Sequence, residues 1–120
     1  MLLINGCIVT DSFLEVSIDA GIVTVYLMRA PVNALSGLLR DQLYSQLAVF
    51  LNDNSVKGIV ITTKDLPFSA GADIKEFSKG LQGKSFVDFY ELLSLAQKPV
   101  IAGIDLYAYG GGLELAMLCH

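Results

Sequence analysis

Lys98–His120, which reads KPVIAGIDLYAYGGGLELAMLCH, is the stretch that decides the fold of this chain. It starts with an apolar run typical of a buried strand, Val100–Ile104, passes through a tight loop into the glycines Gly110–Gly112, and ends in the apolar segment Leu113–Cys119. The only charged residue of that segment is Glu114, which we expect to be buried. Glycine lets a backbone approach a bound group closely, and the first turn of a helix presents unpaired N–H groups. The stretch therefore predicts a site that can hold developing negative charge.

The composition is that of one globular domain. The 120 residues are 53% hydrophobic and 17% charged, which argues against disorder. A net charge of −4 gives no electrostatic basis for binding nucleic acid or an anionic membrane, and no apolar run is long enough to span a bilayer. The N-terminus lacks the features of a signal peptide, and Cys7 and Cys119 have neither metal-binding nor redox spacing. We expect a cytoplasmic protein without a metal site.

Hydrophobic periodicity predicts alternating strands and helices. The expected strands are residues 14–18, 22–27, 56–62 and 100–104. The expected helices are one capped by Ser36, a short helical turn over residues 73–77, an amphipathic one marked by Phe86, Phe89, Tyr90 and Leu93, and the last one after the glycine run. Residues 1–13 read as an irregular or short-strand lead-in, and residues 80–84 as an exposed, mobile linker. The order β-β-α-β-α-β-α indicates an α/β domain with parallel pairing after an initial hairpin.

The final helix is apolar all round, so we expect it to be buried on all sides. The sequence ends at His120, two or three turns into that helix. We therefore expect residues 1–120 to form a single, partial domain.

The glycine run has more than one interpretation. A tight strand-to-helix turn without a ligand explains it as well as a binding loop does. Nucleotide binding fits less well, because Leu115 occupies the third glycine position of G-x-G-x-x-G and no G-K-[ST] is present. Glu114 would also repel a phosphate. A neutral carbonyl that becomes an oxyanion suits this loop better.

A second small-residue turn, Ser69–Lys75, would by itself be a flexible loop capped by Asp73. Both turns, however, follow apolar strands and open helical segments. Ligand sites form at the carboxyl ends of parallel strands, where such turns meet. Two backbone N–H groups from the two loops would together make an oxyanion hole.

Four motifs resemble the crotonase (enoyl-CoA hydratase/isomerase) superfamily: Pro31–Ser36, Phe68–Lys75, Lys98–Gly103 and Tyr109–Ala116. The resemblance runs from about Leu14 to the end of the chain. The ending is particularly similar to the hydratase part of bifunctional enoyl-CoA hydratase/3-hydroxyacyl-CoA dehydrogenase proteins. The resemblance implies an α/β, crotonase-like (ClpP/crotonase) β-β-α spiral, truncated before its C-terminal helices.

The resemblance also implies a function, that of a lyase or isomerase acting on 2-enoyl-CoA thioesters in fatty-acid beta-oxidation. Coenzyme A would be part of the substrate, and no separate cofactor is implied. The oxyanion-hole N–H groups fall on Ala72 and Gly111, and Glu114 matches the first of two glutamates that activate water. The residues that match the lining of the CoA and acyl channel are Ala70, Asp73, Ile74 and Lys75.

This sequence departs from the family pattern at its end. The second glutamate, and the helices that complete the pocket and drive trimerisation in the family, would lie beyond His120. The alternative function is therefore a catalytically incomplete remnant that binds acyl-CoA or only oligomerises. In either case we expect a homo-oligomer or association with a longer relative. His120 sits where many relatives have Asp, and its expected role is structural.

Overall fold

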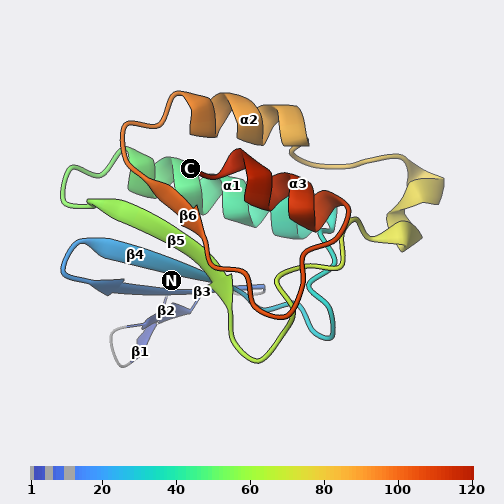
Figure 1. Ribbon diagram of the computed structural model, residues 1–120, viewed down its shortest axis with the longest axis horizontal. Helices are drawn as coiled ribbons and strands as arrows, with labels where there is room; N and C mark the ends of the chain where they lie inside the picture. The colour runs from blue at the N-terminus through green and yellow to red at the C-terminus, as the bar shows by residue number, and fades with distance from the viewer. Residues whose placement is uncertain (1, 5–6, 10–12) are drawn as a thin grey trace.

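The computed structural model describes residues 2–4, 7–9 and 13–120, which form one six-stranded sheet with helices packed on it (Figure 1). The strands are β1 (Leu2–Ile4), β2 (Cys7–Val9), β3 (Leu14–Asp19), β4 (Ile22–Leu27), β5 (Gly58–Thr63) and β6 (Val100–Ala102). The helices are α1 (Gly37–Leu51), the 3₁₀ helix η1 (Ile74–Lys79), α2 (Phe86–Ser94) and α3 (Gly111–Leu118).

The strands lie in the sheet in the order in which they occur in the chain. The pairs from β1 to β4 are antiparallel, with Val16 opposite Val25 in the hairpin of β3 and β4. The pairs β4–β5 and β5–β6 are parallel, with Val25 beside Ile61, which confirms the predicted change of direction after the hairpin. The lead-in takes the short-strand form as β1 and β2, and its residues 1, 5–6 and 10–12 lie outside the described ones.

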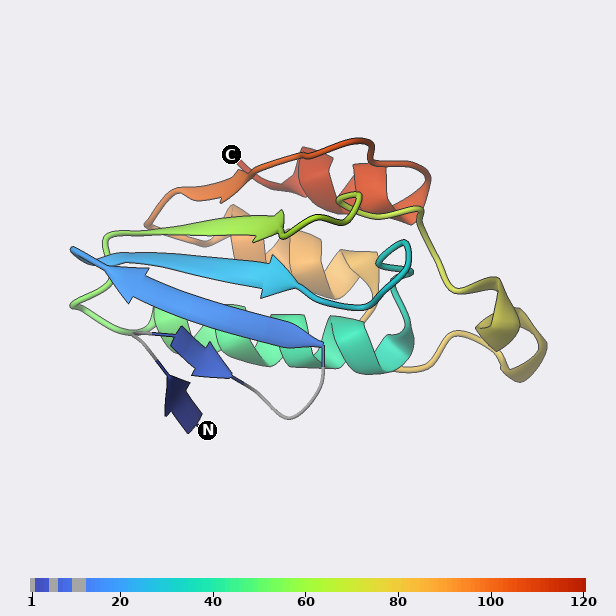
Figure 2. The ribbon, with the colours of Figure 1, turned by 90° about the horizontal axis from the view of Figure 1, so that it is seen from below.

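The core lies between one face of the sheet and the helices. Side chains alternate along β4, so that Val23, Val25 and Leu27 are buried while Thr24 and Tyr26 are only half-buried. Figure 2 shows α1 and α2 behind the sheet, on the face opposite the viewer. The predicted apolar stripe of α1 is fully buried there, at Leu39, Leu43, Leu47 and Phe50.

The predicted caps at Ser36 and Asp73 are confirmed, and α2 begins with a cap at Ser85 that was not predicted. The Ser36 side chain accepts a hydrogen bond from the Leu39 N–H, and Ser85 and Asp88 form a capping box at the start of α2. Asp73 caps η1 through the Lys75 N–H at 3.1 Å. Both views show η1 and the following linker projecting from the body of the molecule (Figures 1 and 2).

The linker is exposed, as predicted, but it is tied down near its end. The buried guanidinium of Arg40 on α1 donates hydrogen bonds to the carbonyls of Gln82 and Lys84. The Lys84 N–H in turn donates to the Asp41 carboxylate at 2.7 Å. These bonds, which the sequence did not indicate, fix the end of the linker to α1.

The expectation that α3 is buried on all sides is wrong for the described residues. Gly112 and Leu115 are buried, but Leu113 is 45% and Met117 74% exposed. Helix α3 packs against α2 and against the loop that leads into α3. No other described element covers the outer face of α3. An apolar composition reports what a helix can bury, whereas the neighbouring elements decide what is buried.

Candidate active site

Two loops that are 40 residues apart in the sequence lie side by side at the ends of β5 and β6. The Tyr109 N–H donates to the Ser69 carbonyl at 3.0 Å, and Ser69 and Ala108 form an isolated parallel bridge. Gly71 packs on the glycine run, because a Cβ placed on it would lie 3.1 Å from the Tyr109 carbonyl and 3.4 Å from the Gly111 nitrogen. The predicted meeting of the two small-residue turns is therefore present.

The backbone N–H groups of Ala72 and Gly111 are neighbours in this arrangement. A Cβ placed on Gly111 would lie 3.5 Å from the Ala72 nitrogen. Within the described part of the chain, neither N–H donates a hydrogen bond. Gly111 is the first residue of α3, where an N–H has no partner in its own helix, and Ala72 precedes η1. Both donors are thus available to an external acceptor.

Glycine is required at the turn into α3. Gly110 has φ +50° and ψ −123°, a conformation that side chains with a Cβ avoid. Gly112 lies so close to the neighbouring loop that a Cβ there would come within 2.6 Å of the Ser69 Cβ. The two glycines on either side of Gly111 hold its N–H beside that of Ala72.

The Ser69 side chain joins the loop around Asn33 to the loop that carries Ala72, and its backbone carbonyl accepts from Tyr109. It is fully buried, and its hydroxyl donates to the Asn33 carbonyl at 2.7 Å while accepting from the Gly71 N–H at 3.0 Å. Asn33 is also fully buried, and its side chain donates to the Pro67 carbonyl at 2.9 Å. Sequence reasoning did not assign Ser69 or Asn33 a role. The only signal was their place inside motifs that resemble the family.

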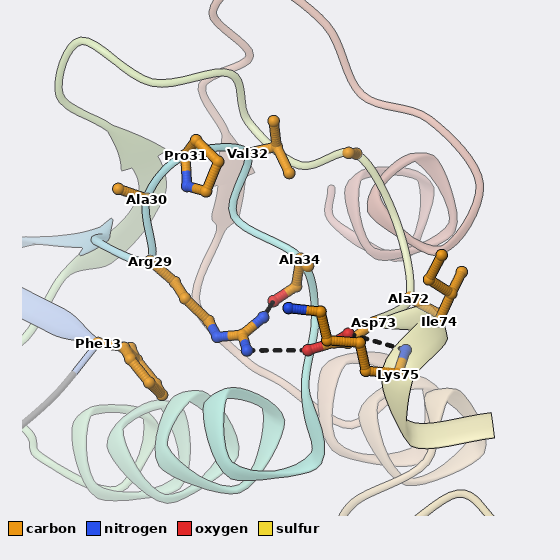
Figure 3. A pocket seen from close by; sticks show the side chains of 11 residues that line it. Phe13, Arg29, Ala30, Pro31, Val32, Ala34, Ala72, Asp73, Ile74 and Lys75 are labelled. Carbon is orange, nitrogen blue, oxygen red and sulfur yellow. Dashed lines mark hydrogen bonds and ion pairs between the residues drawn. The ribbon is translucent and has the colours of Figure 1, made fainter. Parts of the chain in front are cut away.

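An open cavity of about 620 Å³ lies beside these loops (Figure 3). It contains all four residues predicted to bind the substrate, Ala70, Asp73, Ile74 and Lys75, together with Ala72. The remaining lining residues, which sequence reasoning missed, are Phe13, Arg29, Ala30, Pro31, Val32 and Ala34. The wall is mostly apolar, with the charged groups of Arg29, Asp73 and Lys75 set into it, which suits an organic ligand that carries charge.

The charged groups of the cavity are ordered by one ion pair. Arg29 Nη2 lies 2.8 Å from Asp73 Oδ2, and the guanidinium stands 5.3 Å from the centre of the Phe13 ring (Figure 3). The hydrogen bond from the Lys75 N–H, and after it the bond from Arg29, hold the pKa of Asp73 below its ordinary value. Asp73 is therefore an ionised, positioned carboxylate at neutral pH.

Glu114 differs from the expectation. It lies in the first turn of α3, where its N–H donates to the Gly110 carbonyl at 3.0 Å, but its side chain is exposed rather than buried. Neither Glu114 nor Gly111 is among the residues that line the cavity. The carboxylate thus stands three residues after Gly111, open to solvent. The prediction of burial failed because it relied on the apolar neighbours of Glu114 in the sequence.

His120 has the structural contacts that were expected of it. Its Nδ1 accepts from the Val100 N–H at 3.0 Å, and its Nε2 lies 3.1 Å from the Leu93 carbonyl, so the ring links β6 to α2.

Burial raises the pKa of the Cys119 thiol to about 11, so it is protonated and unreactive at neutral pH. Among the residues with described positions, no group of three or more His, Cys, Asp or Glu side chains could hold a metal ion.

The mixed sheet and its loops define a crotonase-fold protein. A crystal structure from Legionella pneumophila, assigned as an enoyl-CoA hydratase/isomerase (crotonase), matches with a TM-score of 0.78 and 27% identity over 92% of this chain. The family model for enoyl-CoA hydratase/isomerase matches residues 17–120. The chain belongs to the enoyl-CoA hydratase/isomerase family.

Individual relatives extend this result. The chain is 45% identical over 96 residues to the mitochondrial enoyl-CoA hydratase of Pongo abelii, and 36% identical over 103 residues to the peroxisomal bifunctional enzyme of Danio rerio. These matches cover 73% and 86% of this chain. The chain spans 32% and 14% of the two relatives, and 46% of the Legionella structure.

The names of the two relatives place them in mitochondria and peroxisomes, so the cytoplasm remains a prediction for this chain. Among the described helices, none has both the length and the apolar character needed to cross a bilayer.

Proposed function

We propose that the chain acts on 2-enoyl-CoA thioesters, with the N–H groups of Ala72 and Gly111 as the oxyanion hole and Glu114 as the group that transfers protons. The observation that carries this proposal is that two neighbouring N–H groups, from separate loops, have no acceptor within the described residues. Such donors stabilise a negative charge that develops on one oxygen.

The proposed chemistry is the addition of water across the double bond next to the thioester. Glu114 takes a proton from water, the water oxygen bonds to C3, and the electrons of the double bond move onto the thioester oxygen as an enolate. The enolate then takes that proton from Glu114 at C2, which regenerates the carboxylate, and the product is a 3-hydroxyacyl thioester. The two N–H groups would bind the enolate oxygen more tightly than the ground-state carbonyl, which lowers the barrier. In an isomerisation Glu114 would instead take a proton from C4, the electrons would move onto the thioester oxygen as a dienolate, and the proton would return at C2, which moves the double bond to C3–C4.

The cavity suggests how the thioester would be held. Its apolar wall near Ala70 and Ile74 suits an acyl chain or the pantetheine arm, and the exposed ammonium of Lys75 suits the phosphates of coenzyme A. No further cofactor is part of the proposal. The balance of apolar wall and isolated charge favours an acyl-CoA over a free nucleotide.

The test is hydration or isomerisation of short and medium 2-enoyl-CoA by the intact chain. We expect Glu114→Gln to lower the rate by at least about 100-fold while leaving acyl-CoA affinity nearly unchanged. Glu91→Gln is the matched control, because Glu91 is an exposed glutamate on α2. A wild-type rate equal to that in buffer would rule out turnover by this chain.

The second candidate is a non-catalytic function in which the chain binds acyl-CoA without converting it. The exposed position of Glu114, outside the cavity lining, favours this alternative. Calorimetric titration with butanoyl-CoA separates the two candidates. Binding without turnover would select the second, and the absence of both would exclude both.

We also propose that the chain associates with itself or with a longer relative. The exposed apolar side chains of Ile101, Leu113 and Met117 lie on the edge strand β6 and on α3, where association would bury them. Light scattering at micromolar concentration tests this expectation. A monodisperse species of 12.9 kDa would count against it.

A further inference from the structure

Arg29 is connected to the Ala72 N–H through two peptide groups that are hydrogen-bonded to each other. Arg29 Nη1 donates to the Ala34 carbonyl at 3.0 Å (Figure 3). The N–H of the same peptide group, which belongs to Leu35, donates to the Gly71 carbonyl at 2.8 Å. That carbonyl shares its peptide group with the Ala72 N–H. The guanidinium and two peptide groups thus form one continuous series of hydrogen bonds, and this series ends in the free N–H of Ala72.

We propose that Arg29 is a positioning residue that sets the direction and the donor strength of the Ala72 N–H through this series of hydrogen bonds. The inference rests on the proposed function, because it assigns Ala72 to the oxyanion hole. Arg29 acts through the two peptide groups, while the thioester oxygen binds at Ala72.

The geometry of the peptide group explains how direction is transmitted. The group is planar, and in its trans form the C=O and the N–H point in opposite directions. Holding the Gly71 carbonyl on Leu35 therefore directs the Ala72 N–H away from Leu35. Ala72 has no helix or extended strand of its own to fix this plane, since it makes only an isolated bridge with Leu35.

The charge of Arg29 adds donor strength. A hydrogen bond from a guanidinium is stronger than one between neutral groups, and hydrogen bonds in series polarise one another by about 10–30% per bond. The Ala34 carbonyl also accepts from the Ser36 N–H at 2.9 Å, so this peptide group is polarised by two donors. We expect the Leu35 N–H, and after it the Ala72 N–H, to become better donors as a result.

The guanidinium is fixed in the place that this role requires. Asp73 binds its other terminal nitrogen at 2.8 Å, and the Phe13 ring lies 5.3 Å away. The pair with Asp73 has a second consequence, since it balances a carboxylate that is next to Ala72 in the sequence. An unbalanced Asp73 would oppose negative charge on the thioester oxygen.

The two donors of the site are held in different ways. The peptide group of the Gly111 N–H has its carbonyl on Gly110, the N-cap of α3, and this carbonyl accepts from the Glu114 N–H in the first turn of the helix at 3.0 Å. A helix therefore fixes the Gly111 donor, whereas the Ala72 donor depends on the chain that starts at Arg29. We expect only the Ala72 N–H to respond to changes at residue 29.

The experiment measures the infrared C=O stretch of butanoyl-CoA labelled with ¹³C at the thioester carbon, bound to the intact chain. Hydrogen bonds to the carbonyl lower its frequency. We expect binding to the wild type to lower the frequency. We expect Arg29→Gln to reduce that shift by about a tenth if only the polarisation of one of the two donors is lost, and by up to about a half if that donor also turns away from the oxygen. Lys64→Gln, at an exposed lysine that pairs with Glu15, is the matched control and is expected to keep the full shift.

A double variant, Arg29→Gln with Asp73→Asn, separates the hydrogen-bonded chain from the balancing of charge. We expect the reduced shift to persist in the double variant, since the hydrogen bond from Arg29 to the Ala34 carbonyl is still missing. Recovery of the wild-type shift would overturn the proposal by assigning the whole effect to the Asp73 charge. If Arg29→Gln does not fold, the double variant, which leaves no unpaired charge, decides the question alone.

The Ala72 amide proton gives a reading that needs no ligand. We expect its NMR resonance to move upfield in the double variant and to stay in place in Lys64→Gln, because a weaker donor chain leaves the proton less polarised. An unchanged resonance together with an unchanged infrared shift would overturn the role of Arg29 and leave the oxyanion hole intact. No shift on binding to the wild type would overturn the oxyanion hole and, with it, this inference.

Discussion

Gly112 and Ser69 lie so close together that a Cβ on the glycine would come within 2.6 Å of the serine Cβ and 2.7 Å of its carbonyl oxygen. This contact sets the distance between α3 and the loop that carries Ala72. Because the backbone of Ser69 is itself bonded to Tyr109, it has little freedom to move away.

We therefore expect Gly112→Ala to lower the free energy of unfolding by about 1–3 kcal/mol, the usual cost of overpacking. Urea denaturation measures the change. Gly58→Ala is the control, since the nearest atoms to its added Cβ lie at 3.4 Å or more, and we expect a smaller loss there. Equal losses for the two variants would contradict the importance of the Gly112 contact.

Ser69→Ala removes the hydroxyl that links the loop around Asn33 to the loop that carries Ala72. The Asn33 carbonyl and the Gly71 N–H then lose a partner inside the protein, which costs about 1–3 kcal/mol of unfolding free energy. We also expect weaker acyl-CoA binding, because Gly71 supports the Ala72 donor. Thermal denaturation and calorimetry measure the two effects.

Ser94→Ala is the control for the serine variant. Ser94 is exposed on α2, and its hydroxyl donates to the Glu91 carbonyl in the same helix. We expect a change within about 0.5 kcal/mol and unaltered binding. A loss for Ser69→Ala no larger than this would show that the buried hydroxyl does not hold the loops together.

The lowered pKa of Asp73, caused first by the hydrogen bond from the Lys75 N–H and then by the bond from Arg29, predicts a dependence of stability on pH. Because the pKa of Asp73 is lowered in the folded protein, its carboxylate stabilises the fold above the unfolded value of about 3.8. That contribution is lost as the pH falls through the folded pKa. Asp73→Asn keeps a capping oxygen for the Lys75 N–H but loses the charge.

We therefore expect Asp73→Asn to be less stable than the wild type at pH 6, and the difference to shrink as the pH falls below about 4. Urea denaturation at pH 6, 4 and 2.5 measures it. A stability difference that does not change with pH would contradict the assignment of the pKa shift to these partners.

Leu106 adopts a left-handed backbone conformation, with φ +59°, and its side chain is 72% exposed. Such a conformation costs a residue with a Cβ about 1–2 kcal/mol, while glycine adds conformational entropy to the unfolded chain. We expect Leu106→Gly to raise the free energy of unfolding by about 0.5–1 kcal/mol. Chemical denaturation measures the change.

Leu95→Gly is the matched control. Leu95 is 82% exposed, but its φ of −93° is ordinary, so glycine relieves no strain there. We expect this variant to be slightly less stable than the wild type. A loss of stability in both variants would show that Leu106 is not strained.

Much of this architecture follows from the sequence by local rules. Alternation in β3 and β4, the stripe from Leu39 to Phe50 in α1, and the cap at Ser36 depend on neighbours within a few residues. The meeting of the two small-residue turns followed from the rule that the carboxyl ends of parallel strands share one edge of the sheet. The family resemblance predicted that Ala70, Asp73, Ile74 and Lys75 bind the substrate, and all four line the cavity.

Only the tertiary structure decided the remaining features. The exposure of Glu114 and of one side of α3 depends on which elements stand opposite them, and apolar composition cannot report that. The roles of Ser69 and Asn33 and the chain from Arg29 to Ala72 depend on hydrogen bonds between segments far apart in the sequence. The sequence by itself therefore determined the elements, their order and the family, because these depend on local patterns. The tertiary structure decided which N–H groups are free and what holds them, because that depends on contacts between distant segments.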